Sequence, residues 1–191
     1  MILIKVDLDK HLVKRAEELL SEVPNGMSRC MRNAINKTTR SAGKSLHNEL
    51  KADYNIKVSE IKRGLNIQKA TLSRLEGKVI ANGPVTRLKK GFKTDTKTPK
   101  AYGAYIKKRS RKSLPEQAFV QTMPKSGHVG IFERTGQKMA SNPKRDEIRE
   151  LKGPSVAGMA NSKNISKEVK NELEVNFDKN FKNEVNKILN K

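Results

Sequence analysis

Residues 118–132 read AFVQTMPKSGHVGIF. Both ends of this stretch are rich in aromatic and β-branched residues, which favour strands. Pro124 and Gly127 stand between them, where the chain needs a turn to reverse its direction. The stretch therefore predicts a β-hairpin with strands at 118–121 and 129–132, and it favours a mostly antiparallel sheet.

Helical periodicity dominates the chain before this hairpin. Pro24-Asn25-Gly26 and a change of pattern near residue 53 divide it into segments. An alternating apolar pattern at 2–8 predicts one strand, and Asp9 can cap the helix after it. Apolar residues at three- and four-residue spacing then predict three helices, over about 12–23, 28–52 and 58–65.

Between residues 70 and 160 the pattern changes to short apolar runs broken by glycine and proline. We expect loops at 94–99 and 135–144, because neither contains the apolar residues that a buried strand needs. We expect a turn or short strand at 147–151, and strands at 71–80, 86–93 and 102–106.

The last segment, from about residue 164, predicts a helix. Its apolar residues recur every four positions from Ile165 to Leu189. A step of four residues advances ~400° around an α-helix, so this apolar stripe drifts around the helix axis. We therefore expect either a break near Asn176 or a helix that packs across several neighbours.

These elements predict a single α+β domain over residues 1–191. Its helices are expected to pack on the mostly antiparallel sheet. The domain would consist of an N-terminal strand and helices (1–69), a β-rich part (70–160) and a C-terminal helix (161–191). A basic arm at about 85–115 is expected to extend from the β-rich part.

Positive charge is the second strong feature of the chain, which has 41 lysines and arginines against 20 acidic residues. Residues 85–112 hold eleven of these bases and one acid, Asp95. Residues 107–112, KKRSRK, contain no apolar position, so they must be solvated or bound to a partner. Such charge is costly unless an anion meets it: nucleic acid, an acidic protein surface or an anionic membrane. We expect this contact at Arg87, Lys89, Lys90, Lys107, Lys108, Arg109, Arg111 and Lys112.

Catalytic chemistry is hard to assemble from the remaining residues. His11, His47 and His128 have no cysteine or carboxylate at metal-ligand spacing, and Cys30 has no histidine near it in sequence. The sequence contains no glycine-rich phosphate loop and no nucleophile elbow. We therefore expect neither an enzyme nor a metal or other cofactor. The single cysteine favours assembly in a reducing cytoplasm, and no apolar run approaches the ~20 residues that cross a bilayer.

Two motifs in the second half of the chain resemble a known family. Residues 127–136 read GHVGIFERTG, and residues 148–156 read IRELKGPSV. Together with AINKT at 34–38 and VSEIKR at 58–63, they resemble the minor tail protein Z family of phages and prophages. The likeness extends from about residue 27 to residue 159.

This resemblance implies a structural virion protein at the head–tail junction, assembled in the host cytoplasm. Such a neck or tail-completion subunit would join further copies of itself, with six expected, in a ring around the DNA channel. Closed rings need an interface in which one surface meets a different surface of the next copy. The other implied partners are the tail terminator, the tail tube and head-connector proteins, and DNA in the channel. The motif residues are expected to be architectural: Gly127, Val129, Gly130, Phe132, Gly136, Leu151, Gly153, Pro154 and Ser155.

A different class of function fits the charge as well. A free basic protein could bind nucleic acid through phosphates without sequence preference. Aromatic residues make up only 4% of the chain and tryptophan is absent, which disfavours a stacking platform for single strands. A membrane-surface protein has the least support, because no strongly amphipathic basic helix with large apolar residues is evident.

Overall fold

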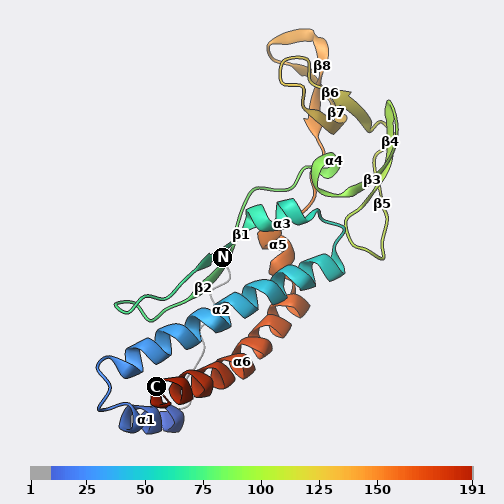
Figure 1. Ribbon diagram of the computed structural model, residues 1–191. Helices are drawn as coiled ribbons and strands as arrows, with labels where there is room; N and C mark the ends of the chain where they lie inside the picture. Colours follow the sequence, from blue (N-terminus) through green and yellow to red (C-terminus); the bar gives the residue numbers. More distant parts are fainter. Residues whose placement is uncertain (1–9, 191) are drawn as a thin grey trace. The chain divides into compact units, whose positions relative to one another are not determined.

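The computed structural model describes residues 10–190 and has an α+β fold with antiparallel sheets (Figure 1). The strand expected at 2–8 and the cap expected at Asp9 lie outside the described residues. The chain forms two compact units. Unit 1 comprises the described residues up to Glu49, Leu65–Asn82 and the segment from Ala160 onward, and unit 2 comprises Leu50–Gly64 and Gly83–Met159. The expectation of a single domain stays an expectation.

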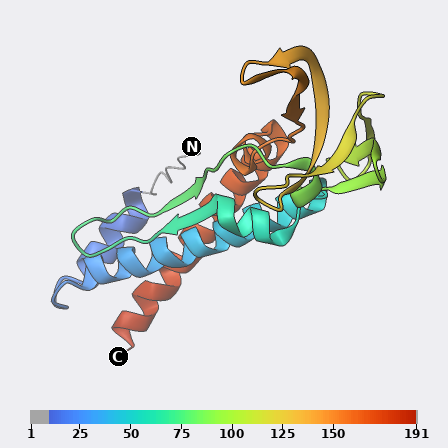
Figure 2. The same ribbon diagram turned by 90° about the horizontal axis from the view of Figure 1, so that it is seen from above.

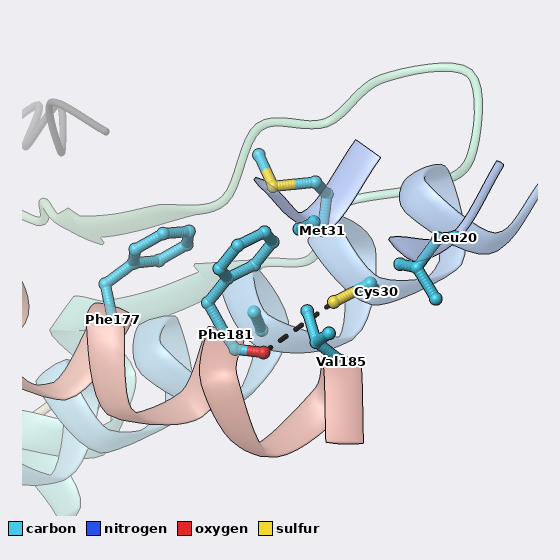
Figure 3. Packing of buried hydrophobic residues seen from close by; sticks show 8 residues of the cluster. Leu20, Cys30, Met31, Phe177, Phe181 and Val185 are labelled. Atoms are coloured by element: carbon cyan, nitrogen blue, oxygen red, sulfur yellow. Dashed lines mark hydrogen bonds between the residues drawn. The ribbon is translucent and has the colours of Figure 1, made fainter. Parts of the chain in front are cut away.

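Unit 1 is built on three helices whose apolar faces meet in one cluster (Figure 3). These are α1 (Lys10–Leu19), most of α2 (Gly26–Asp53) and α6 (Lys163–Leu189). Asn25 separates α1 from α2 with a φ of 54°, a left-handed conformation that asparagine tolerates better than most residues. α2 begins within the Pro24-Asn25-Gly26 motif, but α1 ends at Leu19, earlier than the expected end near residue 23. Their shared core consists of Ala16, Leu20, Cys30, Met31, Ala34, Phe177, Phe181 and Val185.

α6 runs antiparallel to α2, and the two lie side by side (Figures 1 and 2). Hydrogen bonds join Asn33 to Glu184 (3.0 Å) and Asn180 to Thr38 (3.0 Å), so the residue numbers rise along one helix as they fall along the other. α6 is continuous from Lys163 to Leu189, which excludes the expected alternative of a break near Asn176. The drifting stripe is buried along its length, at Ile165, Val169, Leu173, Phe177, Phe181 and Val185.

A two-stranded hairpin lies against the other side of α2. It consists of β1 (Leu65–Gln68) and β2 (Lys78–Ala81), which pair from Leu65↔Ala81 to Gln68↔Lys78. Of the strand expected at 71–80, only residues 78–80 form a strand, and β2 ends one residue later at Ala81. The loop is tied to α2 by Asn36, whose side chain accepts a hydrogen bond from the backbone N–H of Ala70 (2.7 Å) and donates one to its carbonyl (3.1 Å).

Unit 2 contains a six-stranded antiparallel sheet in the order β3-β4-β6-β7-β8, with β5 paired to β4. The hairpin predicted at 118–132 is confirmed as β6 and β7, which pair from Phe119↔Phe132 to Thr122↔Val129. The expected strand at 102–106 falls largely within β4. The strands are β3 (Lys93–Lys97), β4 (Lys100–Tyr105), β5 (Lys112–Ser113), β6 (Phe119–Thr122), β7 (Val129–Met139) and β8 (Asn142–Glu150).

Three short helices accompany this sheet in sequence: α3 (Val58–Gly64), α4 (Leu88–Gly91) and α5 (Val156–Ala160), the last of which crosses the boundary between the units. α3 confirms the helix predicted at 58–65, which ends one residue early. The prediction of a strand at 86–93 is wrong, because four of these residues form α4. Leu88 and Phe92 are buried at the two ends of this turn of helix, and their spacing of four fits a helical turn as well as it fits alternate positions of a strand.

The two loops expected at 94–99 and 135–144 are also wrong, because most of their residues belong to β3, β7 and β8. These strands carry few apolar residues and are held by backbone pairing and by polar side chains. Asp146 binds both Arg134 (3.2 Å) and Lys138 (2.7 Å) across the β7–β8 pair. Gly136 lies inside β7 with a φ of +81°, within a shift of register.

Candidate functional site

The segment at about 85–115, expected as an extended basic arm, is folded over most of its length as α4, β3, β4 and β5. The longest loop that remains in this segment lies between β4 and β5. We call residues 106–112 the cationic loop. Its backbone is held at both ends, because Asn55 donates to the carbonyl of Ile106 (2.9 Å) and Lys112 pairs with Ala104 in the sheet. In between, the N–H of Lys108 donates to the carbonyl of Asp53 (2.9 Å).

Four side chains of the cationic loop are exposed and have no hydrogen bond or ion pair to any residue between 10 and 190: Lys107, Lys108, Arg109 and Lys112. Arg111 differs, because its guanidinium binds the carboxylate of Asp95 on β3 at 2.9 Å. It also lies against Gly103, where an added Cβ would be 2.7 Å from the Arg111 Nε. Glycine at 103 thus leaves room for the Arg111 side chain to pass over β4 and reach Asp95 on β3.

The other three cations expected at the site contact polar or acidic side chains of unit 2. The Arg87 Nε lies 3.3 Å from a Glu150 oxygen, and the other Glu150 oxygen lies 2.7 Å from the His128 Nε2. Lys89 donates to the Thr96 hydroxyl (3.0 Å). The Lys90 Nζ lies 3.9 Å from the carboxylate of Glu60.

Arg87 and Lys90 also line a hollow of about 310 Å³ together with two bases that the sequence did not suggest, Arg63 and Lys152. Arg87 and Lys152 meet through an antiparallel bridge between segments 65 residues apart in the chain. The eight expected cations therefore form two groups, and the side chains without any hydrogen bond or ion pair among the described residues are the four in the cationic loop.

The residues of the two family motifs make contacts within the chain. An added Cβ at Gly130 would lie 2.7 Å from the Phe132 ring, and one at Gly153 would lie 2.5 Å from the Phe92 ring. Leu151 donates its N–H to the carbonyl of Ile131 (2.8 Å), and Gly153 donates to Thr86 (2.7 Å). Leu151 thus contacts β7, and Gly153 at the start of the GPSV turn contacts Thr86 and Phe92 on either side of α4.

The remaining motif residues lie at turns or at the surface. Gly127 has a φ of +63° in the β6–β7 turn, a conformation that favours glycine. Val129 is exposed at the start of β7. Ser155 precedes α5, and its hydroxyl accepts a hydrogen bond from the N–H of Gly158 (3.0 Å). Pro154, between Gly153 and Ser155, is half-buried. None of these positions brings catalytic groups together.

Unit 1 carries a second basic surface that the sequence did not reveal. A hollow of about 900 Å³ opens between α2, α6 and the loop after β1, and we call it the α2–α6 groove. Five cations line it against a single acid, Glu184. Arg32, Lys37 and Arg40 lie close together on α2, whereas Lys69 and Lys187 come from distant segments that the sequence did not connect with them.

Glu184 forms the floor of this groove. Its buried carboxylate binds the Lys37 ammonium and accepts a hydrogen bond from the Asn33 amide at 3.0 Å. Burial alone raises the pKa of Glu184, but the hydrogen bonds from Lys37 and Asn33 and the charges of Lys37 and Lys187 outweigh burial, so the pKa lies below its ordinary value. The hydrogen bond to Glu184 in turn raises the pKa of Lys37. Glu184 is therefore ionised, and its charge is paired with Lys37. The other cations that line the groove outnumber this single acid, so the groove is positively charged.

The candidate reactive groups lie apart from both surfaces. Cys30 is buried in the helical core, where its Sγ donates to the carbonyl of Phe181 at 3.7 Å (Figure 3). Burial and the charge of Glu184 raise the pKa of this thiol to about 11, so it is protonated at neutral pH. Between residues 10 and 190, no three histidine, cysteine or acidic side chains form a cluster suited to a metal ion. No helix in the same range is long and apolar enough to span a membrane.

These features define a basic α+β protein with one basic surface on each unit, whose family motifs make contacts within unit 2. The prophage minor tail protein Z (GPZ) family model matches residues 12–191. The chain belongs to this family, and it is therefore a structural protein of phage tails and a virion component. No curated protein and no solved structure matches the chain.

Proposed function

We propose that this tail protein acts at the head–tail junction, as a neck or tail-completion subunit. Copies of it form a ring around the DNA channel and link the tail tube and its terminator to the head connector. The proposal starts from the family match over 12–191. Its role is assembly, and it involves no catalytic step.

The cationic loop is the observation that carries the proposal furthest. Four unpaired cations within six residues repel one another, and the fold nevertheless holds their backbone in place through Asp53, Asn55 and β4. A loop that is ordered before binding loses less conformational entropy on contact. We infer that it meets a dense anionic surface, either the phosphates of DNA in the channel or the carboxylates of a neighbouring ring.

Repetition in a ring strengthens this argument. Each copy contributes a formal charge of +21, so a closed ring brings a large positive charge together in one place. Such a field needs DNA or acidic neighbours beside it. A free nucleic-acid-binding protein would also use the loop, but it would not enter particles, and this difference separates the two functions.

The test replaces the four unpaired cations together by glutamine: Lys107→Gln, Lys108→Gln, Arg109→Gln and Lys112→Gln. Because these side chains are exposed and unpaired among the described residues, folding stability should change by no more than ~0.5 kcal/mol. In a phage or prophage lacking its own copy, the variant should yield far fewer complete, infectious particles.

A matched control removes four other exposed cations: Lys125, Lys144, Arg145 and Lys170, each changed to glutamine. This control has the same net charge as the loop variant, so a general charge effect would lower both yields equally. Equal yields from the two variants, or a normal yield from the loop variant, would contradict the proposed role.

A further inference from the structure

The α2–α6 groove of unit 1 collects positive charge without a matching number of acids. Of the described residues that line it, five are bases and one is an acid, which leaves a formal charge of +4. The acid, Glu184, pairs with Lys37, and the Lys187 Nζ lies 3.6 Å from the same carboxylate. Arg40 and Lys69 are exposed and have no hydrogen bond or ion pair to any residue between 10 and 190. These two cations therefore have no anionic partner in the described part of the chain.

One wall of the groove is a row of polar side chains along α2. Arg32, Asn36 and Arg40 follow one another at four-residue spacing, so they lie on one side of the helix. The Arg32 guanidinium is oriented by Asn33, whose amide oxygen accepts hydrogen bonds from it at 2.8 and 3.2 Å. The row covers about 12 Å of helix. One strand of duplex DNA carries a phosphate about every 3.4 Å along the axis, so the row can lie beside about three or four phosphates.

The opposite wall is the loop after β1, and Asn36 holds this loop against α2. The Asn36 side chain exchanges two hydrogen bonds, at 2.7 and 3.1 Å, with the backbone of Ala70, the residue next to Lys69. Within the loop, the Thr71 N–H donates to the Arg74 carbonyl (2.9 Å), and the Thr71 hydroxyl accepts from the Arg74 N–H (3.1 Å). The backbone that carries Lys69 is therefore held in place before any ligand arrives, which lowers the conformational entropy lost on binding.

The rest of the lining fits a phosphate backbone better than it fits a peptide. Thr71 and Ser73 add exposed hydroxyl groups, which commonly contact phosphate oxygens alongside lysine and arginine. Leu72 is the one exposed large apolar residue among the described lining residues, whereas a docked amphipathic helix needs several apolar contacts along its length. The same lining contains no aromatic side chain on which unpaired bases could stack, which favours a duplex over a single strand.

We propose that the α2–α6 groove binds the sugar-phosphate backbone of duplex DNA. Arg40 and Lys69 contact phosphates from the two walls, and Arg32 extends the contact along α2. Binding depends on charge and shape and has no sequence preference, because contacts to phosphates carry no sequence information directly. The inference goes beyond the proposed function, which uses only the cationic loop of unit 2, and it does not depend on where in the tail the protein lies.

Counterion release gives the size of the expected effect. Each phosphate that a lysine or arginine neutralises on duplex DNA contributes about 0.9 to the slope of log affinity against log salt concentration. Removal of Arg40 and Lys69 should therefore reduce the magnitude of this slope by about 1.8. With ~1 M salt as the state in which released counterions no longer contribute, the loss at ~0.1 M salt is about eightfold for each cation and roughly 60-fold for the pair.

The experiment measures binding of the purified full-length protein to a fluorescent duplex of about 20 base pairs over a range of salt concentrations. The starting protein is the loop variant described above, which removes the contribution of the cationic loop. The groove variant adds Arg40→Gln and Lys69→Gln, and the control adds Lys179→Gln and Lys182→Gln. Lys179 and Lys182 are exposed and, by helical spacing, lie on the side of α6 opposite Glu184.

The groove variant should show the roughly 60-fold loss at ~0.1 M salt and the smaller salt slope. The control should stay within about twofold of the starting protein, because charges away from the contact are largely screened. Arg40→Lys/Lys69→Arg keeps both charges and should also bind within about twofold of the starting protein. A duplex of unrelated sequence should give the same values. All the substituted side chains are exposed, so circular dichroism should show unchanged helix content.

Several results would overturn the inference. Equal losses in the groove variant and the control would show a general effect of charge, and full duplex binding by the groove variant would remove DNA from the groove. A loss seen only with a single-stranded oligonucleotide would contradict binding of a duplex. Polyglutamate of matched charge that displaces the duplex as well as unlabelled DNA does would assign the groove to an acidic protein surface. The neck location is tested separately, by the particle yield of the loop variant.

Discussion

Replacing Gly153 by alanine should destabilise the protein through a single steric conflict. The new Cβ would lie 2.5 Å from the Phe92 Cε2 and 3.1 and 3.2 Å from two further ring atoms. Carbon atoms settle about 3.5–4.0 Å apart, so the ring would have to retreat by about 1 Å. Phe92 is buried, and overpacking of this kind costs ~1–3 kcal/mol. For a chain of this size, that corresponds to roughly 2–4 °C of melting temperature per kcal/mol.

The assay is thermal and urea unfolding of the wild type and the Gly153→Ala variant, with Gly158→Ala as the control. Gly158 is exposed in α5, and its added Cβ would meet only the Ser155 hydroxyl at 3.4 Å. That change should be neutral or stabilising by up to ~1 kcal/mol, because alanine favours a helix more than glycine does.

A second background tests the cause of the effect. Phe92→Leu removes ring atoms and opens space beside residue 153. In that background Gly153→Ala should cost much less than in the wild type, with a coupling energy of ~1–2 kcal/mol. Equal costs in both backgrounds, or a Gly153→Ala variant as stable as Gly158→Ala, would refute the reasoning that the GPSV turn needs glycine to accommodate Phe92.

Two further predictions concern buried groups of unit 1. The pKa of Glu184 is lower in the folded protein than in the unfolded chain, so its stabilising effect is present above pH ~4.3 and is lost as the pH falls through the folded value. The difference in unfolding free energy between wild type and Glu184→Gln should therefore shrink as the pH falls below about 4, and a difference that is constant or grows would contradict this. Burial raises the pKa of Cys30 from 9.0 to about 11, so a thiol reagent at pH 8 should label the native protein at least ~100-fold more slowly than the urea-unfolded chain; similar rates would contradict the buried position.

The sequence predicted those parts of the fold that a hydrophobic pattern determines. α2 and α6 have buried stripes at helical spacing, so both were recognised with bounds close to those observed. The β6–β7 hairpin has apolar strands on both sides of a Pro–Gly turn, so its paired part was recognised, although β7 continues to Met139. The drift of the α6 stripe left two alternatives open. The choice between them depends on how the helix packs, which its own sequence does not encode.

The errors occurred where backbone hydrogen bonds and ion pairs hold a strand without apolar residues. β3 and the far ends of β7 and β8 have this character, and Asp146 with its two cations is an example. A polar strand of this kind has the same composition as a solvated loop. The prediction for α4 failed for another reason, because the spacing of Leu88 and Phe92 fits both a strand and a helical turn.

The candidate sites follow the same division. The cationic loop was visible because its bases are adjacent in sequence, although the pairing of Arg111 with Asp95 was not. The α2–α6 groove was invisible because Arg40, Lys69 and Lys187 come from three segments that only the fold brings together. Contiguous charge can be read from a sequence, whereas charge assembled by helix packing cannot.

Imaging of intact particles by electron microscopy, with this chain located by its density or by a fused tag, tests the central claim most directly. The account predicts a closed ring of copies between the top of the tail tube and the head connector, with residues 106–112 directed at DNA or at an acidic neighbouring ring. Density for this chain along the tube or at the distal tip of the tail, or particles that are complete without it, would contradict the account.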